Sequence, residues 1–257
     1  MSVSWRSHAR TDAGEVRTHN EDAILELAEE GLWSVADGMG GHHQGDYASA
    51  LAVSLLREYR ASPYRGVALA RLDRLVGRCN DALLRHARAH GVDVVGCTLA
   101  VLTLHGRSAL ASWCGDARIY RVRRGRLRVL TRDHSVGCEF DDRDRHEPPE
   151  PEPRNRAALT AAVGGERTPR LEHGWFALDD GDRFLLCTDG LVKEVSDAEI
   201  LADVHEARSA EGAVEALFAR YRERGARDNV GLVAVDLGRT PGPSPATPPS
   251  HPTGHAE

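Results

Sequence analysis

Lysine is almost absent from this sequence. Lys193 is the only one, and arginine supplies the rest of the side-chain positive charge apart from histidine. The chain therefore has no GxxxxGK phosphate-binding loop and no lysine in a kinase-like context. P-loop nucleotidases and protein kinases are thereby excluded.

Long apolar runs and charge of a single sign are also missing. No apolar stretch approaches the roughly 18 residues that a membrane span needs, and the first residues, MSVSWRSHAR, lack the apolar segment of a signal peptide. The formal net charge is −6, with acids and bases interspersed, so neither a nucleic-acid footprint nor a polybasic membrane anchor is indicated. We expect a soluble cytoplasmic protein with no nucleic-acid or membrane partner.

Cysteine is sparse, and its five positions form no CxxC pair. An odd, scattered set is typical of small core residues in a reducing compartment. Cys79–Arg85 does fit the C-x5-R pattern of cysteine phosphatases. The pattern falls inside an expected amphipathic helix without glycine, so its backbone amides are already bonded and cannot cradle a phosphate. We therefore predict a structural role for Cys79.

The most informative stretch runs from residue 32 to residue 52, LWSVADGMGGHHQGDYASALA. Residues 32–36 are predicted to form a buried strand that stops at Asp37. A glycine-rich turn follows at 38–41, and after Gly45 the apolar residues recur with helical spacing. An acid at the end of a buried strand is well placed to hold a ligand. An aspartate and glycines chosen only for the turn are an equally simple interpretation of this stretch alone.

Periodicity predicts alternating groups of strands and helices in a single domain, residues 1–238, followed by a disordered Pro/Ser/Thr-rich tail, residues 239–257. The expected helices are one after Gly45 that ends near Ser62-Pro63, one over Val67–His90 and one over Ala210–Arg224. The expected strands are an edge-like Val3–Arg10, a hairpin over 23–36, a meander of Val95–Leu104, Ser108–Cys114, Ala117–Arg123 and Arg126–Leu130, and then Leu171–Ala177, Asp182–Cys187 and Val230–Leu237. Residues 133–165 contain a flap-like segment, with a Glu-Pro run at 146–153 that we expect to be extended, either as a surface loop or as a lid.

Acids stand where apolar strands meet turns. Asp37, Asp189 and Asp228 share this setting, and Asp116 sits at an expected hairpin tip. If these side chains converge they need cations, because two like charges about 4 Å apart repel by about 4 kcal/mol at an effective dielectric near 20. Oxygen ligands suit Mg²⁺ or Mn²⁺, and no HxH or HExxH motif or paired Cys/His set competes for a softer metal.

Taken together, the motifs resemble the bacterial branch of the metal-dependent PP2C (PPM) Ser/Thr protein phosphatases. The matching stretches follow the family's order: RTHNED (17–22), DGMGGHHQGDYAS (37–49), GCTL (96–99), GDAR (115–118), TRDHS (131–135), LTAAVGG (159–165), TDGL (188–191) and RDNV (227–230). The resemblance implies an α+β fold, a four-layer αββα sandwich of two antiparallel sheets flanked by helices. It also implies a metal cleft at one end of the sandwich.

The resemblance assigns a role to each site residue. It implies two Mn²⁺ or Mg²⁺ ions, with a third, weaker ion in some bacterial members. The implied metal ligands are Asp37 as the bridge, the backbone carbonyl of Gly38, Asp189, Asp228 and, for the third ion, Asp116. The implied second layer consists of Glu21 and Asp22, which would orient bound waters. Arg17 would bind the phosphate, and His42 is a candidate general acid by its position in the sequence.

The implied reaction is hydrolysis of phosphoserine and phosphothreonine by a metal-activated water, without a phosphoenzyme. The substrates would be phosphoproteins, made by a Ser/Thr kinase in bacterial signalling, and the enzyme would act as a monomer. The alternative is a catalytically weak phosphoprotein-binding regulator of the same fold. Two departures concern substrate choice: Ala161 replaces the family's usual arginine, and the Glu-Pro run interrupts the flap.

Overall fold

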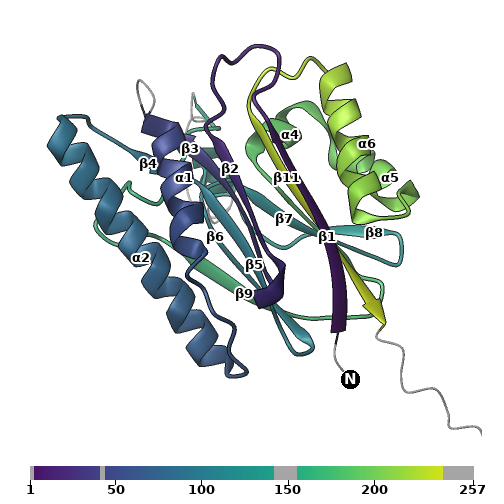
Figure 1. The fold of residues 1–257 in the computed structure, drawn as a ribbon. Coiled ribbons are helices and arrows are strands. Elements are labelled where there is room, and N and C mark those ends of the chain that lie inside the picture. Colours follow the sequence, from purple (N-terminus) through teal and green to yellow (C-terminus); the bar gives the residue numbers. More distant parts are fainter. Residues whose placement is uncertain (1–2, 41–43, 142–154, 240–257) are drawn as a thin grey trace, which may run out of the picture.

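Two antiparallel sheets form the centre of the computed structural model, which describes residues 3–40, 44–141 and 155–239 (Figure 1). The first sheet has the order β1-β11-β10-β7-β8, with bounds β1 (Val3–Asp12), β11 (Val230–Arg239), β10 (Arg183–Cys187), β7 (Arg118–Arg123) and β8 (Arg126–Val129). The second has the order β2-β3-β5-β6-β9, with bounds β2 (Asp22–Leu27), β3 (Leu32–Met39), β5 (Leu99–His105), β6 (Ser108–Cys114) and β9 (Glu172–Ala177), and β4 (Gly96–Cys97) pairs with β3. The edge position predicted for the first strand is confirmed.

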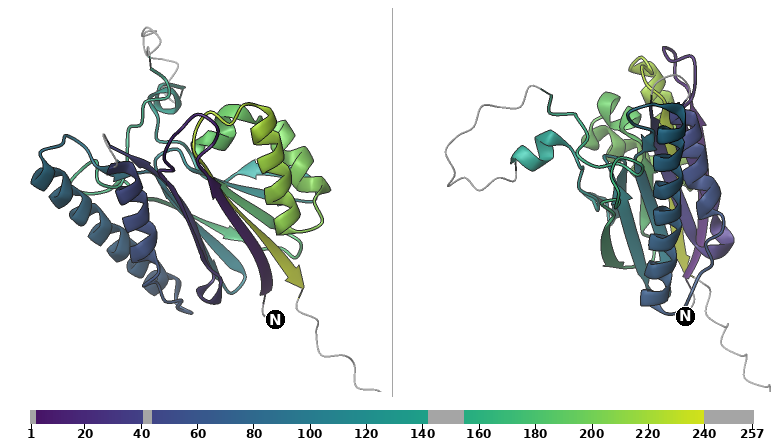
Figure 2. Two further views of the ribbon diagram at one scale, coloured as in Figure 1. Left: turned by 45° about the horizontal axis from the view of Figure 1, so that its top comes forward. Right: turned by 90° about the vertical axis from the view of Figure 1, so that its left-hand side faces the viewer.

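Helices cover the outer face of each sheet, as the views in Figure 1 and Figure 2 show. The second sheet carries α1 (Gln44–Leu56) and α2 (Arg65–His90). The first carries α4 (Asp189–Glu194), α5 (Asp197–Glu206) and α6 (Ala210–Glu223). Two short helices lie in the connections: η1 (Ala28–Glu30) and α3 (Val136–Asp141).

Three hydrophobic clusters lie between the layers. One joins α1 and α2 to the second sheet, a second fills the space between the sheets, and a third joins the first sheet to α5 and α6. The strands of both sheets alternate their side chains between two of these clusters, since successive residues of a strand point to opposite faces. The predicted four-layer αββα sandwich is confirmed.

Apolar spacing and glycine positions in the sequence predicted the helices α1 and α2. The apolar spacing in α2 buries one face, and the helix ends where Gly91 adopts the left-handed conformation at φ 64°. The end predicted for α1 was wrong: the helix stops at Leu56, not near residue 62. The apolar period continues to Tyr59 because that ring is fully buried, although its backbone has already tightened into i→i−3 hydrogen bonds.

The predicted meander was wrong at one connection. β6 belongs to the second sheet and β7 to the first, so the turn between them crosses the sandwich rather than closing a hairpin. Gly115 makes this crossing at φ 99°, so closely packed that a Cβ would lie 2.7 Å from the Thr98 side chain. The correction moves Asp116 from a hairpin tip to the junction between the two sheets.

The strand before the glycine-rich turn was also predicted too short. β3 continues through Asp37 to Met39 because Gly38 and Met39 pair with β4. Asp37 therefore occupies a strand position, held by neighbours on both sides.

Several expectations fall outside the described residues: His42, the Glu-Pro run at 146–153, and the tail from residue 240 onward. Within the ranges that the structure does describe, no helix combines the length and hydropathy needed to cross a bilayer.

Candidate metal centre

The predicted acids lie at one end of the sandwich. Asp22 and Asp37 face each other across the β2–β3 pair, each two residues beyond an apolar residue of the inter-sheet layer, and strand alternation turns both toward the other sheet. From the first sheet, β10 leads into Asp189 and Asp228 stands shortly before β11. At the top of Figure 1 the loop between β1 and β2 lies beside the loop between α6 and β11, which carries Asp228.

Asp22 is the most buried carboxylate of the group, with 7% of its surface exposed. Its Oδ2 accepts a hydrogen bond of 2.7 Å from the Thr188 hydroxyl, which ties the two sheets together, while Oδ1 is buried without a hydrogen-bond partner among the described residues. Burial, with the charges of Asp189 and Asp228, raises the pKa of Asp22 to about 7. A bound cation or water would satisfy this oxygen.

The charges of four other aspartates act on Asp37. Burial raises the pKa of Asp37 well above its usual range, and Asp22, Asp189, Asp116 and Asp228 each raise it further. The structure therefore brings together the four acids that the strand-end pattern selected. It adds Asp22, which the family resemblance had implied.

Asp116 approaches from the sheet-crossing turn. Burial, together with the charges of Asp189 and Asp133, raises the pKa of Asp116 to about 7. The turn is held by Arg118, whose guanidinium donates to both carboxylate oxygens of Asp133, with a shortest distance of 2.7 Å. Asp133 is thereby paired with Arg118, whereas the charge of Asp189 reaches Asp116 from the centre.

Positive charge in the centre comes from Lys193 and Arg17. The Lys193 ammonium lies 2.6 Å from Asp189 Oδ2 and 2.9 Å from Asp228 Oδ2, and Arg17 Nε lies 2.9 Å from Asp228 Oδ1. Burial opposes ionisation of Asp228, but these cations outweigh it and lower its pKa. Across the described ranges, no three His, Cys, Asp or Glu side chains stand as a ready-made metal site, so cations would draw these carboxylates closer.

The remaining predicted residues lie around this cluster. Arg17 belongs to the loop between β1 and β2, with 57% of its side chain exposed. The Glu21 carboxylate lies beside Gly45, where a Cβ would meet Oε1 at 2.7 Å and the carbonyl oxygen of Gly38 at 2.8 Å. Glu21 and Gly38 thus border the same small space, whereas His42 is outside the described residues.

Two residues that hold the centre together were not predicted from the sequence. Asn229 donates its amide to the carbonyl oxygens of Ala13 and His19 and accepts from the Glu21 backbone N–H at 2.9 Å, so it positions the loop that carries Arg17. Thr188 joins Asp22 to β11. Both stand next to acids in the motifs RDNV and TDGL, where the sequence reading considered only the acid.

The close approach at Gly38 supports a first prediction. A Cβ at this position would lie 1.9 Å from the carbonyl oxygen of Gly45, so Gly38→Ala is expected to lower the free energy of unfolding by about 3 kcal/mol or more. Chemical denaturation measures this change. Gly77→Ala, in the interior of α2 with nothing within 4 Å, is the matched control and should stabilise by about 0.5–1 kcal/mol. Equal stability of the two variants would contradict the packing described.

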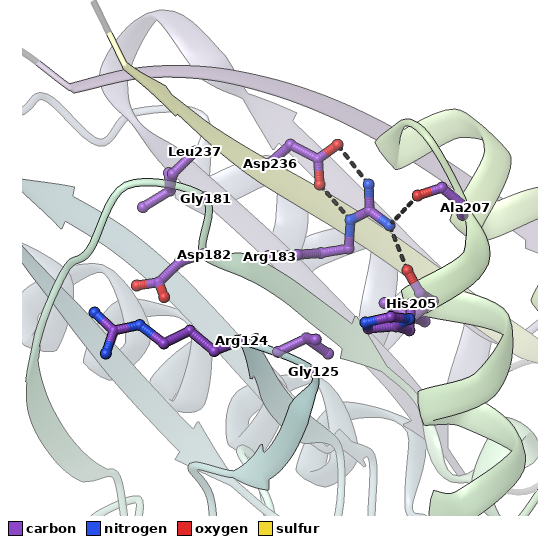
Figure 3. Close-up of a pocket in the computed structure, with 11 residues that line it drawn as sticks. Arg124, Gly125, Gly181, Asp182, Arg183, His205, Ala207, Asp236 and Leu237 are labelled. Carbon is purple, nitrogen blue, oxygen red and sulfur yellow. Dashed lines mark hydrogen bonds and ion pairs between the residues drawn. The ribbon is translucent and has the colours of Figure 1, made fainter.

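A cavity of about 390 Å³ lies at the opposite end of β10 (Figure 3). Its central cation, Arg183, is committed to Asp236 and to the carbonyl oxygens of Val204 and Ala207. Asp182, also in its lining, is paired with Arg123. Because its main charged groups are already neutralised within the fold, this cavity is a weaker candidate than the carboxylate centre.

Comparison with known proteins identifies relatives. The chain matches the "Protein phosphatase 2C" family model over residues 9–230. "Serine/threonine protein phosphatase PstP" of Mycobacterium tuberculosis is 34% identical over 240 residues, which is 92% of this chain and 46% of that protein. The chain thus spans just under half the length of this relative. "Serine/threonine phosphatase stp" of Listeria innocua is 28% identical over 243 residues, 88% of this chain and 94% of that protein.

Solved structures show the same fold. PppA, "a key regulatory component of T6SS in Pseudomonas aeruginosa", superimposes with a TM-score of 0.83 at 37% identity, covering 92% of this chain and 100% of that one. The catalytic domain of PstP "in complex with 2 Manganese ions" gives a TM-score of 0.79 at 32% identity, covering 93% and 100%.

The side chains present here fit hard divalent cations. They offer clustered carboxylate oxygens, one of them buried without a hydrogen-bond partner, and within the described ranges no set of cysteine or histidine side chains competes for the ions. With the family model matching most of its length and the αββα fold shared with solved relatives, the chain belongs to the protein phosphatase 2C family.

Proposed function

We propose that this chain is a metal-dependent protein phosphatase that hydrolyses phosphoserine and phosphothreonine. The observation that carries the proposal is the gathering of carboxylates around Asp37, each held by a different part of the fold. Carboxylates this close together stay ionised at neutral pH only beside cations, and a phosphate ester needs cations to offset its own charge.

Each carboxylate then has a proposed role. Asp37 would touch both ions, with the Gly38 carbonyl completing one site and Asp189 and Asp228 the other. Asp22 and Glu21 would orient waters from the second layer. The bound ions would supply positive charge and an acidified water next to the phosphate.

Arg17 is the proposed phosphate ligand. Its closest approach to Asp228 is through Nε, and its two terminal nitrogens make no hydrogen bond to the described residues. A planar guanidinium with both terminal nitrogens available matches two phosphate oxygens. Its place on an exposed loop also allows a bulky phosphoprotein to reach it.

Direct transfer to water is favoured over a covalent phosphoenzyme. Cys79, the cysteine of the C-x5-R pattern, is buried in α2, and burial raises the pKa of its thiol to about 12, so it carries little thiolate at neutral pH. A proton donor for the leaving alcohol is still required, and His42 stays the proposed candidate.

The physiological setting is proposed from the same family membership. The substrates would be bacterial phosphoproteins made by a Ser/Thr kinase, and the enzyme would act in the cytoplasm as a monomer. Residues 1–238 would form one catalytic domain.

Hydrolysis of a phosphothreonine peptide and of p-nitrophenyl phosphate tests the proposal. With Mn²⁺ the full chain should turn over both, and excess chelator should abolish turnover until Mn²⁺ is restored. Phosphopeptide binding without any chelator-sensitive release of phosphate would overturn it in favour of a binding regulator. A variant at an exposed acid distant from the centre, Asp81→Asn, is the control for charge changes in general.

A further inference from the structure

The only lysine of the chain lies inside the carboxylate centre. Lys193 follows Asp189 by one turn of α4, and its ammonium contacts Asp189 at 2.6 Å and Asp228 at 2.9 Å. Residues four apart on a helix share a face, so the contact with Asp189 is built into the helix itself. α4 is fixed in turn by Leu191, which is fully buried.

The contacts leave some oxygens of the centre occupied and others available. Lys193 takes one oxygen of Asp189 and one of Asp228, while the second oxygen of Asp228 is ion-paired with Arg17 and accepts from the Asn229 backbone N–H. The ion pair of Asp189 with Lys193 is made through Oδ2 alone at its closest approach, and Oδ1 of Asp22 is buried without a hydrogen-bond partner among the described residues. Ligands therefore remain for divalent ions deeper in the centre, toward Asp37.

Lys193 also acts on the sheet-crossing turn. The charges of Lys193 and Asp189, of opposite sign, both reach Asp116. About half of the Lys193 side chain is exposed, so Lys193 stands between the buried carboxylates and the solvent. This is the neighbourhood shared by Asp116 and Asp189, the acids that the family scheme pairs around a third ion.

Charge balance favours a resident ammonium over a third divalent ion. The centre holds five aspartates, and two divalent cations plus one ammonium neutralise them when all are ionised: Asp22, Asp37, Asp116, Asp189 and Asp228. Arg17 and Glu21 at the rim add one charge of each sign. A third divalent cation beside Lys193 would leave excess positive charge and would lie against an ammonium at close range.

We propose that Lys193 takes the place of a third divalent cation, so that the centre of this chain holds two ions. The inference refines the proposed function, on which it rests for the identity of the metal site. It makes Lys193 a positioning residue, a built-in cation that orients Asp189 and Asp228 and balances Asp116.

Counting bound manganese tests the proposal. Full-length protein is dialysed to equilibrium against saturating Mn²⁺, and the metal bound per chain is measured by elemental analysis. We expect two ions for the wild type and three for Lys193→Met, because the apolar isostere frees an oxygen on each of Asp189 and Asp228. Lys193→Arg, which keeps the charge, should retain two.

Arg227→Met is the matched control. It removes one positive charge beside Asp228, but Arg227 is exposed and pairs with Glu194. The control should bind two ions, as the wild type does. A count of three in the wild type, or an unchanged count in Lys193→Met, would overturn the proposal.

A second readout is independent of metal. Without Mn²⁺, Lys193→Met should melt at a lower temperature than Arg227→Met, since the carboxylates lose their internal counter-ion, and saturating Mn²⁺ should remove most of this difference. Equal melting temperatures of the two metal-free variants would also count against the proposal. Neither the metal count nor the melting temperature depends on turnover. If the counts are as expected but the protein has no phosphatase activity, the proposed function is contradicted and the role of Lys193 is not.

Discussion

Asp37→Asn is expected to reduce turnover of a phosphothreonine peptide by about a thousand-fold or more, while the protein stays folded. The amide keeps the shape of the side chain but removes the charge around which the other aspartates gather. Loss of one preorganised charge at a reacting centre costs a factor of this order, about 4 kcal/mol in the barrier. Initial rates at saturating Mn²⁺ measure the loss.

The same substitution should stabilise the metal-free chain. Ionised Asp37 is buried among like charges, and the neutral amide avoids that repulsion. Asp37→Asn should thus unfold at a higher temperature than the wild type in chelator, and gain less from added Mn²⁺. Asp81→Asn, on the exposed surface of α2, should change neither property. Activity of Asp37→Asn within threefold of the wild type would contradict its proposed role between the ions.

The second large effect concerns pH and the metal-free chain. The pKa values of Asp22 and Asp116 are raised from 3.8 to about 7 in the folded state. Between these values the folded chain binds more protons than the unfolded one. Its stability therefore falls as pH rises from about 4 to about 7, by up to about 1.4 kcal/mol per pH unit for each group.

Urea denaturation at a series of pH values in chelator measures this fall. The double variant Asp22→Asn/Asp116→Asn is the comparison, because it lacks both groups and should show a flatter profile over the same window. Mn²⁺ should stabilise the wild type more at pH 8 than at pH 5, since it binds the ionised carboxylates. A wild-type profile that rises more steeply than that of the double variant between pH 4 and 7 would show that these acids are not desolvated in the fold.

Much of the architecture follows from local patterns. The apolar period and Gly91 define α2, and the hairpin over 23–36 brings Asp22 opposite Asp37 without any long-range information. The family resemblance supplied the order of the layers. Physical reasoning from strand ends selected Asp37, Asp189 and Asp228 independently.

Contacts between residues far apart in the sequence could not be predicted from local patterns. The turn at Gly115 reads like any tight hairpin, and only the packing against Thr98 and the separate sheets show that it crosses the sandwich. The contacts of Asn229 and Thr188 join residues that are 208 and 166 positions apart, so no local window contains them. Lys193 was noted for its rarity, but its partner Asp228 lies on another segment of the chain.

The placing of β11 has a consequence for synthesis of the chain. β11 is the last of the described strands along the sequence, yet it lies between β1 and β10, and Asp228 and Asn229 come just before it. Until β11 has emerged from the ribosome, the nascent chain lacks the strand that joins β1 to β10, and its carboxylate cluster is incomplete. Synthesis must pass β11 before these carboxylates can be held together, so products that end before this strand would lack a complete centre and be exposed to quality-control proteases.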